Sequence, residues 1–261
     1  MLRALATAAT GMEAQQTKLD VTAHNIANVS TAGYKKSRAE FADLMYQTMR
    51  PAGAPTGGGA GAPSGVDVGL GVRITATPRT FTEGELNQTG GALDIAIQGK
   101  GFYPITMPDG STAYTRNGAF QLSSEGKIVN AEGYAIAGDL TVPPEAQSIN
   151  VASDGTVTAT VPGDPAPVEV GQIQLASFAN PGGLMPLGDT LFKETSASGN
   201  AVLGAPGEGG AGALMQGTLE LSNVNVVEEM VDLISGQRAY EVNTKVIKAA
   251  DEMLGQTAQI R

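Results

Sequence analysis

The chain has 261 residues, a mean hydropathy of −0.04 and a net charge of −10, and it contains neither cysteine nor tryptophan. The absence of cysteine excludes disulfides and thiolate metal sites, and an acidic surface repels the phosphate backbone, which argues against nucleic acid as a partner. No apolar run approaches the roughly 18 residues that a membrane span requires, so we expect no membrane insertion.

The first predicted element is a long amphipathic helix, residues 1–30. Apolar side chains recur there at alternating steps of three and four, which is the a/d pattern of a coiled-coil helix. The helix should end near Asn28, where a β-branched and turn-forming sequence begins. Its start does not resemble a secretory signal, because the apolar stretch at residues 5–9 is short and polar residues follow it. We expect subunit packing along this seam by Leu2, Leu5, Met12, Leu19 and Ile26, with Ala9, Gln16 and Ala23 between them.

A connecting segment, residues 31–65, follows the helix. Its second part, residues 51–65, is uncharged and rich in glycine and proline. Such a composition predicts a flexible linker or loop that is ordered only where neighbouring molecules hold it. The stretch also fits the loose glycine pattern of a dinucleotide site. No βαβ unit surrounds it, so the linker interpretation is favoured.

Residues 66–221 are predicted to form a β-rich outer domain. Short runs of β-branched and aromatic residues alternate there with turn dipeptides, which is typical of antiparallel strands. The clearest alternation is in residues 156–161 and 93–97. The turn dipeptides are Asp109-Gly110, Asn117-Gly118, Glu125-Gly126, Glu132-Gly133 and Asp154-Gly155.

The last predicted element is a second amphipathic helix, residues 222–261. Asn225 is placed to cap it, with Glu228 three residues on. A second apolar stripe lies on a neighbouring face, so the helix should be contacted on more than one side. The expected seam residues are Val226, Met230, Leu233, Tyr240, Ile247 and Leu254. The second stripe contains Val242, Val246, Ala249, Met253 and Ile260.

These elements predict an α+β fold in which long N- and C-terminal helices form a coiled-coil-like layer and enclose a mainly antiparallel β-domain. Soluble monomers rarely leave large apolar stripes in water. The helices should therefore form an intramolecular hairpin or bundle with helices of other copies. The double stripe favours bundling, and with it a homo-polymer.

No catalytic, cofactor or metal site is expected. His24 is the only histidine, so a site built on several histidines is excluded. Glu83, Glu85 and Asp94 could supply a carboxylate pair for glycoside hydrolysis. Acidic residues on a β surface are usually just solvated. A secreted glycan-binding or glycan-cleaving β-domain is therefore kept as the alternative from a different class of function.

Several segments resemble the signatures of bacterial flagellar rod and hook proteins, and the resemblance covers nearly the whole chain. At the N-terminal end it lies in residues 11–16, 19–21 and 25–35, the last reading Asn-Ile-Ala-Asn-Val-Ser-Thr-Ala-Gly-Tyr-Lys. At the C-terminal end it lies in residues 216–224 and 237–243. His24 and Tyr34 depart from the residues that the family most often has there. Between the ends it lies in residues 38–44, 69–73, 93–102 and 114–120.

The resemblance implies a structural, non-enzymatic subunit of the flagellum. Within the family, the modest length and the Gly/Pro-rich stretch favour the distal rod over the hook, with hook and proximal rod as alternatives. Such a subunit is expected to assemble helically into a hollow rigid shaft that transmits torque and conducts exported subunits. The expected location is the basal body, where the rod crosses the periplasm. Expected partners are further copies, proximal rod and hook subunits, the rings around the rod, and the flagellar type III export apparatus, which needs no cleaved signal peptide.

Two groups of residues carry further expectations. The first consists of family-motif positions, some of which could fix the register of the helical bundle as a buried asparagine does in coiled coils. The second is a proposed stiffening segment that would wedge between subunits, since glycine allows close backbone approach. The motif residues are Asn25, Asn28, Gly33, Tyr34, Arg238 and Asn243, and the stiffening residues are Pro51, Gly57, Gly58, Gly59 and Pro63.

Overall fold

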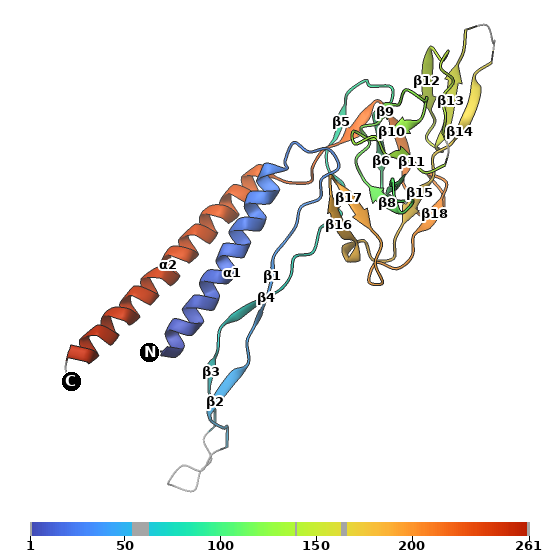
Figure 1. The fold of residues 1–261 in the computed structure, drawn as a ribbon. Coiled ribbons are helices and arrows are strands. Elements are labelled where there is room, and N and C mark those ends of the chain that lie inside the picture. Colours follow the sequence, from blue (N-terminus) through green and yellow to red (C-terminus); the bar gives the residue numbers. More distant parts are fainter. Residues whose placement is uncertain (1, 54–62, 139, 163–165, 260–261) are drawn as a thin grey trace. The chain divides into compact units, whose positions relative to one another are not determined.

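A computed structural model describes residues 2–53, 63–138, 140–162 and 166–259 and divides the chain into two compact units (Figure 1). Unit 1 comprises residues 1–26, 37–78 and 225–261, and unit 2 comprises residues 27–36 and 79–224. The chain therefore passes between the units at four points, after residues 26, 36, 78 and 224.

Unit 1 contains the two terminal helices. Helix α1 spans Leu2–Ala27 and helix α2 spans Val226–Gln259. Asn225 caps α2, because its Oδ1 accepts hydrogen bonds from the backbone N–H groups of Val227 (3.0 Å) and Glu228 (3.5 Å). The prediction of one helix at each end is confirmed.

Unit 1 also contains four strands that the sequence did not predict as part of the helical region. Two of them, β1 and β2, lie in the segment predicted as a connection. The other two, β3 and β4, lie in residues 66–78, which were predicted as the start of the outer domain. The pairs β1–β4 and β2–β3 are antiparallel. The bounds are β1 Glu40–Asp43, β2 Tyr46–Arg50, β3 Val66–Gly69 and β4 Val72–Ala76.

Unit 2 is an antiparallel β-structure of short strands. Its largest sheet has the order β16-β17-β8-β7-β11-β10-β9, beside a three-stranded sheet β12-β13-β14 and the pairs β15-β18, β19-β6 and β20-β5. A 3₁₀ turn, η1, spans Pro181–Gly183. The bounds are β5 Leu86–Gln88, β6 Ile95–Gln98, β7 Tyr103–Thr106, β8 Thr112–Thr115, β9 Gln121–Leu122, β10 Ile128–Val129, β11 Ala135–Ile136, β12 Ser148–Val151, β13 Thr156–Thr160, β14 Val168–Gln172, β15 Leu175–Ser177, β16 Met185–Gly188, β17 Leu191–Lys193, β18 Val202–Gly204, β19 Ala213–Gln216 and β20 Thr218–Glu220.

The predicted turn dipeptides largely mark the hairpins of unit 2. Asp109-Gly110 joins β7 to β8, and Asp154-Gly155 joins β12 to β13, with both glycines at positive φ (80° and 86°). Asn117-Gly118 differs, because it follows β8 without turning the chain into a paired strand. Instead, the Gly118 carbonyl accepts a hydrogen bond from the backbone N–H of Ile95 (3.0 Å).

Two apolar clusters form the core of unit 2. The larger one gathers branched aliphatic side chains around the fully buried Tyr103 and Phe120, whose rings meet edge to face with centroids 5.0 Å apart. The smaller one is mainly aromatic and contains Phe102, Tyr114 and Phe192. Neither described helix is long and apolar enough to cross a membrane. The α+β class, with two terminal helices and a largely antiparallel body, is confirmed.

Candidate functional site

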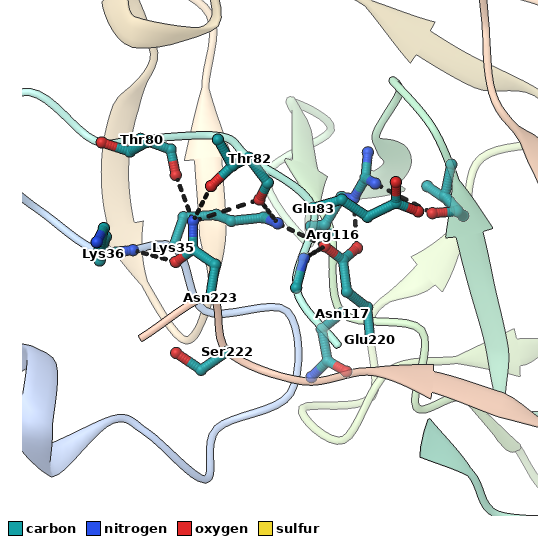
Figure 2. Close-up of polar contacts among 12 residues, drawn as sticks. Lys35, Lys36, Thr80, Thr82, Glu83, Arg116, Asn117, Glu220, Ser222 and Asn223 are labelled. Atoms are coloured by element: carbon teal, nitrogen blue, oxygen red, sulfur yellow. Dashed lines mark hydrogen bonds and ion pairs between the residues drawn. The ribbon is translucent and has the colours of Figure 1, made fainter. Parts of the chain in front are cut away.

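Three charged side chains from distant parts of the sequence meet inside unit 2 around Glu220, the last residue of β20 (Figure 2). Lys35 Nζ lies 2.5 Å from Glu220 Oε1, and Arg116 Nε donates to Glu220 Oε2 at 2.6 Å. The backbone N–H of Gly84 also donates to Oε1, at 2.9 Å. Lys35, Glu220 and Arg116 are only 1%, 2% and 6% exposed. We name these three residues the Glu220 cluster.

The remaining hydrogen-bonding capacity of the Glu220 cluster is also used. Lys35 Nζ donates to the carbonyl of Thr82 at 2.6 Å. The Arg116 guanidinium donates to the carbonyls of Ile97 (3.0 Å), Gly99 (2.5 Å) and Gly101 (2.7 Å). Within the described part of the chain, no buried side-chain nitrogen or oxygen lacks a hydrogen-bond partner. A cluster satisfied in this way rigidifies the segments that it joins.

Burial and charge act in opposite directions on the Glu220 cluster. Burial alone would raise the pKa of Glu220, but Arg116 and Lys35 outweigh it and hold that pKa below its ordinary value. Burial lowers the pKa of Lys35, and the attraction of Glu220 opposes this only in part. Both shifts describe charges that depend on each other, so removing one partner leaves the others buried and uncompensated.

The family-motif residues Gly33 and Tyr34 lie in unit 2 next to this cluster, and not on the helix seam. Gly33 has φ +68°, and its backbone N–H donates to the Glu220 carbonyl at 2.8 Å. A Cβ at this position would lie 2.5 Å from the backbone nitrogen of Asn117, so only glycine fits. Tyr34 is buried beneath Arg79, whose Cζ is 5.7 Å from the ring centroid.

Within unit 1, α1 and α2 run antiparallel and contact each other through a line of alternating large and small residues. Lys18 Nζ and Asp232 Oδ1 are 3.1 Å apart, and Thr244 Oγ1 lies 3.7 Å from Met12 Sδ. The predicted large residues Leu5, Met12, Leu19, Ile26, Leu233, Ile247 and Leu254 are half-buried. The positions between them are shifted by one residue from the prediction. On α1 they are Ala8, Gln15 and Thr22 in place of Ala9, Gln16 and Ala23, and on α2 they are Gly236, Asn243 and Ala250 in place of Gln237, Thr244 and Asp251.

Glycine lets the two helices approach most closely at two points of this line. A Cβ at Gly11 would lie 3.1 Å from Asn243 Nδ2, and one at Gly236 would lie 3.0 Å from Leu19 Cδ2. Asn243, predicted to set register, therefore packs against Gly11. These small residues fix the spacing that a larger side chain would change.

Asn25, another predicted register residue, ties the end of α1 to two other parts of unit 1. Its Nδ2 donates to the Ser37 carbonyl (2.9 Å) and to Glu229 Oε2 (3.2 Å), and its Oδ1 accepts from the Ser37 N–H (3.0 Å). Asn28 lies after the helix, and its carbonyl accepts from the N–H of Thr31 (3.2 Å).

The other predicted seam and motif residues of α2 face outward. Val226, Met230 and Tyr240 are exposed, as is Arg238. The side chain of Leu2 and residues Gly57, Gly58 and Gly59 of the predicted stiffening segment lie outside the described residues, while Pro51 and Pro63 are described and exposed.

Unit 1 exposes many large apolar side chains on both its helices and its strands. On α2, Val227 and Val231 are 71% and 62% exposed, and on the strand pair β2–β3 and its approach Met45 is 82% exposed. The further exposed residues are Phe41, Tyr46, Met49, Val66, Leu70, Ile234, Val242, Val246 and Met253. By contrast, the fully buried apolar residues of unit 1, among those described, are Ala8, Ala14 and Ala250.

Two of the three carboxylates considered for glycoside hydrolysis accept local hydrogen bonds. Glu83 Oε1 accepts from the backbone N–H of Gly99 (3.1 Å), and Asp94 Oδ2 accepts from the Thr89 hydroxyl. No group of three or more potential metal ligands occurs in the part of the chain that the structure describes. His24 lies on the exposed surface of α1.

The roles of Lys35, Arg116 and Glu220 were not predicted, although all three lie in the segments that carry the family resemblance. Glu220 lies between Leu219 and Leu221 at the end of β20, and strand alternation places it on the face opposite the two leucines, where a charge is normally solvated, whereas the structure buries it. A charge in such a place needs a partner of opposite sign. The sequence alone did not identify which of the basic residues supplies it.

Comparison with known proteins matches three family descriptions to this chain. "Flagella basal body rod protein" covers residues 5–35, "Flagellar hook protein FlgE/F/G D1 domain" covers residues 96–159, and "Flagellar basal body rod FlgEFG protein C-terminal" covers residues 215–260. The first match ends on Lys35 and the last one contains Glu220. The two charges that meet in unit 2 therefore belong to the terminal signatures of the family.

Individual relatives agree with these matches. The flagellar basal-body rod protein FlgG of Caulobacter vibrioides is 49% identical over 261 residues and covers 100% of both chains. That of Agrobacterium fabrum is 49% identical over 253 residues and covers 97% of both chains. The flagellar hook protein FlgE of Helicobacter mustelae is 42% identical over 139 residues, which is 53% of this chain and 31% of the hook protein.

Proposed function

This chain belongs to the family of flagellar basal-body rod and hook proteins, and from that membership we propose that it is a structural subunit of the distal rod that polymerises helically. Its terminal helices would form a coiled-coil layer with those of other copies. Unit 2 would face outward from that layer.

One observation carries the proposal: the described residues of unit 1 form no apolar core of their own. Its fully buried apolar side chains, among the described residues, are three alanines, whereas many of its valine, isoleucine, methionine and tyrosine side chains are exposed. Burial contributes about 25 cal/mol per Å² of apolar surface. A unit built in this way gains its main stabilisation only when neighbours cover it.

The exposed apolar residues of α2 lie on two flanks, which favours more than one neighbour. One flank contains Val227, Met230, Val231 and Ile234, each one or two positions after a heptad position of the contact line with α1. The other flank contains Val242, Val246 and Met253, each one position before a residue of that line. One partner helix covers one flank, so two further copies are needed.

Length favours the rod over the hook. The chain covers 97–100% of the two rod relatives named above but only 31% of the hook protein. The shaft would transmit torque to hook subunits, pass through the surrounding rings in the periplasm and receive its subunits through the flagellar export apparatus. Residues 46–65 would limit sliding between neighbours and so stiffen the shaft.

Polymerisation can be tested with two matched substitutions at exposed valines. Val231→Asp places a charge on α2, and Val202→Asp places one on β18 of unit 2, where the valine is 65% exposed. Sedimentation and electron microscopy of concentrated protein should show polymers for the parent chain and for Val202→Asp, and monomers for Val231→Asp. Polymers of Val231→Asp that match the parent would refute the role of α2.

The place in the flagellum can be tested in a strain that lacks this chain. Electron microscopy of isolated basal bodies should show rods truncated before the outer rings and no hook. Complete rods that lack only a hook would assign the chain to the hook, and normal motile flagella would overturn the assignment to the axial structure.

A further inference from the structure

The side chain of Asn223 joins three segments at the places where the chain enters or leaves unit 2 (Figure 2). Asn223 precedes the last exit, which follows residue 224. Lys36 is the residue before the exit that leads to β1, and Thr80 follows the re-entry after residue 78. All three residues lie in unit 2, so their contacts belong to one compact body.

The amide of Asn223 uses both its acceptor and its donors in these contacts. Its Oδ1 accepts from the backbone N–H of Lys36 at 2.8 Å. Its Nδ2 donates to the Thr80 carbonyl at 2.8 Å and to Thr82 Oγ1 at 2.9 Å. The N–H of Thr80 closes the set by donating to the Lys36 carbonyl at 2.9 Å.

We propose that the Asn223 side chain links three of the connections between the units by hydrogen bonds at the places where they leave unit 2. We call this side chain with its hydrogen bonds the clip. A single extended segment resists bending and twisting weakly, because φ and ψ can vary within the allowed regions without breaking any hydrogen bond. Strands cross-linked by hydrogen bonds must deform together, so a load on one is shared by the others. The clip therefore restricts the freedom of unit 1 to turn against unit 2.

The chemistry of the side chain explains why asparagine occupies this position. The Lys36 N–H needs an acceptor, and the Thr80 carbonyl and Thr82 hydroxyl need a donor, so the site needs both from one short side chain. Aspartate at this position would keep the acceptor but would turn a carboxylate oxygen toward the Thr80 carbonyl. Alanine would remove both functions.

The role of the clip in an assembled shaft rests on the proposed function. The restricted freedom between the units exists in the isolated subunit as well and can be measured there. The native chain has no cysteine, so spin labels can be attached at two introduced cysteines without background. Ser235→Cys on α2 and Asn87→Cys on β5 are exposed positions in unit 1 and unit 2. The width of the label-to-label distance distribution reports the freedom between the units.

Asn223→Ala should broaden this distribution, and Asn223→Asp should broaden it less. Asn200→Ala, at an exposed asparagine of unit 2, is the matched control and should leave the width unchanged. Hydrogen exchange at the Lys36 amide should become roughly tenfold faster in Asn223→Ala. It should stay close to the parent rate in Asn223→Asp, which keeps the acceptor.

The result that overturns the proposal is a distribution in Asn223→Ala as narrow as in the parent while the Lys36 amide exchanges fast. Equal broadening in Asn200→Ala would overturn it as well. If Asn223→Ala fails to fold by circular dichroism, Asn223→Asp and Thr82→Val carry the test. Each removes contacts of Asn223 Nδ2 and keeps the acceptor for Lys36, so distributions as narrow as in the parent for both variants would overturn the proposal. None of these measurements requires polymer formation, so their outcome is independent of the polymerisation test.

Discussion

The two units of this chain handle charge and apolar surface in opposite ways. Unit 2 buries Lys35, Arg116 and Glu220 and satisfies their hydrogen bonds, and it also contains two apolar clusters. Unit 1 leaves large apolar side chains in water and buries alanines. Unit 2 therefore has the interior of a self-sufficient domain, whereas unit 1 has the surface of a part that is completed by neighbours. In a subunit of this kind, the structure of unit 2 can be fixed before assembly, whereas the structure of unit 1 is fixed by assembly.

The largest expected effect tests the self-sufficiency of unit 2. Glu220→Ala leaves Lys35 and Arg116 buried without their counter-charge, and breaking a buried pair costs about 3–5 kcal/mol. Urea unfolding of the monomer, followed by circular dichroism of the β-signal, should show this loss.

The control is the exposed pair Arg38–Glu40 in unit 1. Glu40→Ala should change stability by about 0–1 kcal/mol, since exposed pairs contribute little. Similar losses for Glu220→Ala and Glu40→Ala would contradict the contrast between the units.

The next effect concerns the backbone beside the Glu220 cluster. Gly33→Ala combines a positive φ with a Cβ only 2.5 Å from Asn117 N, and we expect a loss of about 2–3 kcal/mol. Gly90→Ala is the matched control, because Gly90 also has positive φ (+74°) but no atom lies within 4 Å of the added Cβ. In thermal unfolding, the melting temperature of Gly33→Ala should lie well below that of Gly90→Ala. Equal losses of stability would mean that the contact with Asn117 is unimportant.

A smaller effect follows from the lowered pKa of Glu220. A carboxylate whose pKa is depressed by folding contributes stability that is fully present above its unfolded pKa, about 4.3. That contribution is lost as the pH falls through the lower folded pKa. Stability measured by urea unfolding should therefore decline more steeply with acid in the parent than in Glu220→Gln.

The same acid range contains other carboxylates that must be separated from Glu220. Hydrogen bonds from Ser111 and Thr156 lower the pKa values of Asp109 and Asp154, which are both exposed. Asp109→Asn serves as the control and should retain most of the acid dependence of the parent. If Asp109→Asn removed as much of the acid dependence of stability as Glu220→Gln does, the Glu220 cluster would not be the source of that dependence.

The smallest effect tests the close helix contact in unit 1. Gly255→Ala on α2 meets no atom within 4 Å and should stabilise the helix by up to about 1 kcal/mol through helix propensity. Gly236→Ala gains the same propensity but places its Cβ 3.0 Å from Leu19 Cδ2. Thermal unfolding of the helical signal should show a smaller gain for Gly236→Ala, and an equal gain would mean that α1 and α2 do not constrain each other there.

The sequence predicted those features that depend on local patterns. Asn225 with Glu228 marked the start of α2, and the dipeptides Asp109-Gly110 and Asp154-Gly155 marked hairpins, because capping and turn geometry are decided within four residues. Strand order and the strands β1–β4 were not predictable in this way. They depend on pairing between segments as distant as Glu40 and Ala76.

The helix contact shows why a periodic pattern is not enough. The prediction placed Gln237, Thr244 and Asp251 at the second heptad position of α2, but the structure places the smaller Gly236, Asn243 and Ala250 there. Hydrophobicity alone would allow several registers between the two helices. Shape complementarity selects one of them, because small side chains allow the helices to approach each other. The residues Met230 and Val231 are thereby left on the surface.

The Glu220 cluster finally imposes an order of events on folding during synthesis, which starts at the N-terminus. Lys35 and its partner Glu220 are 185 residues apart, so the ion pair cannot close until most of the polypeptide has emerged. Until then Lys35 and Arg116 have no counter-charge, and burying them is unfavourable. We therefore expect unit 2 to close only after Glu220 has been synthesised, because Lys35 and Arg116 are buried against this one late carboxylate.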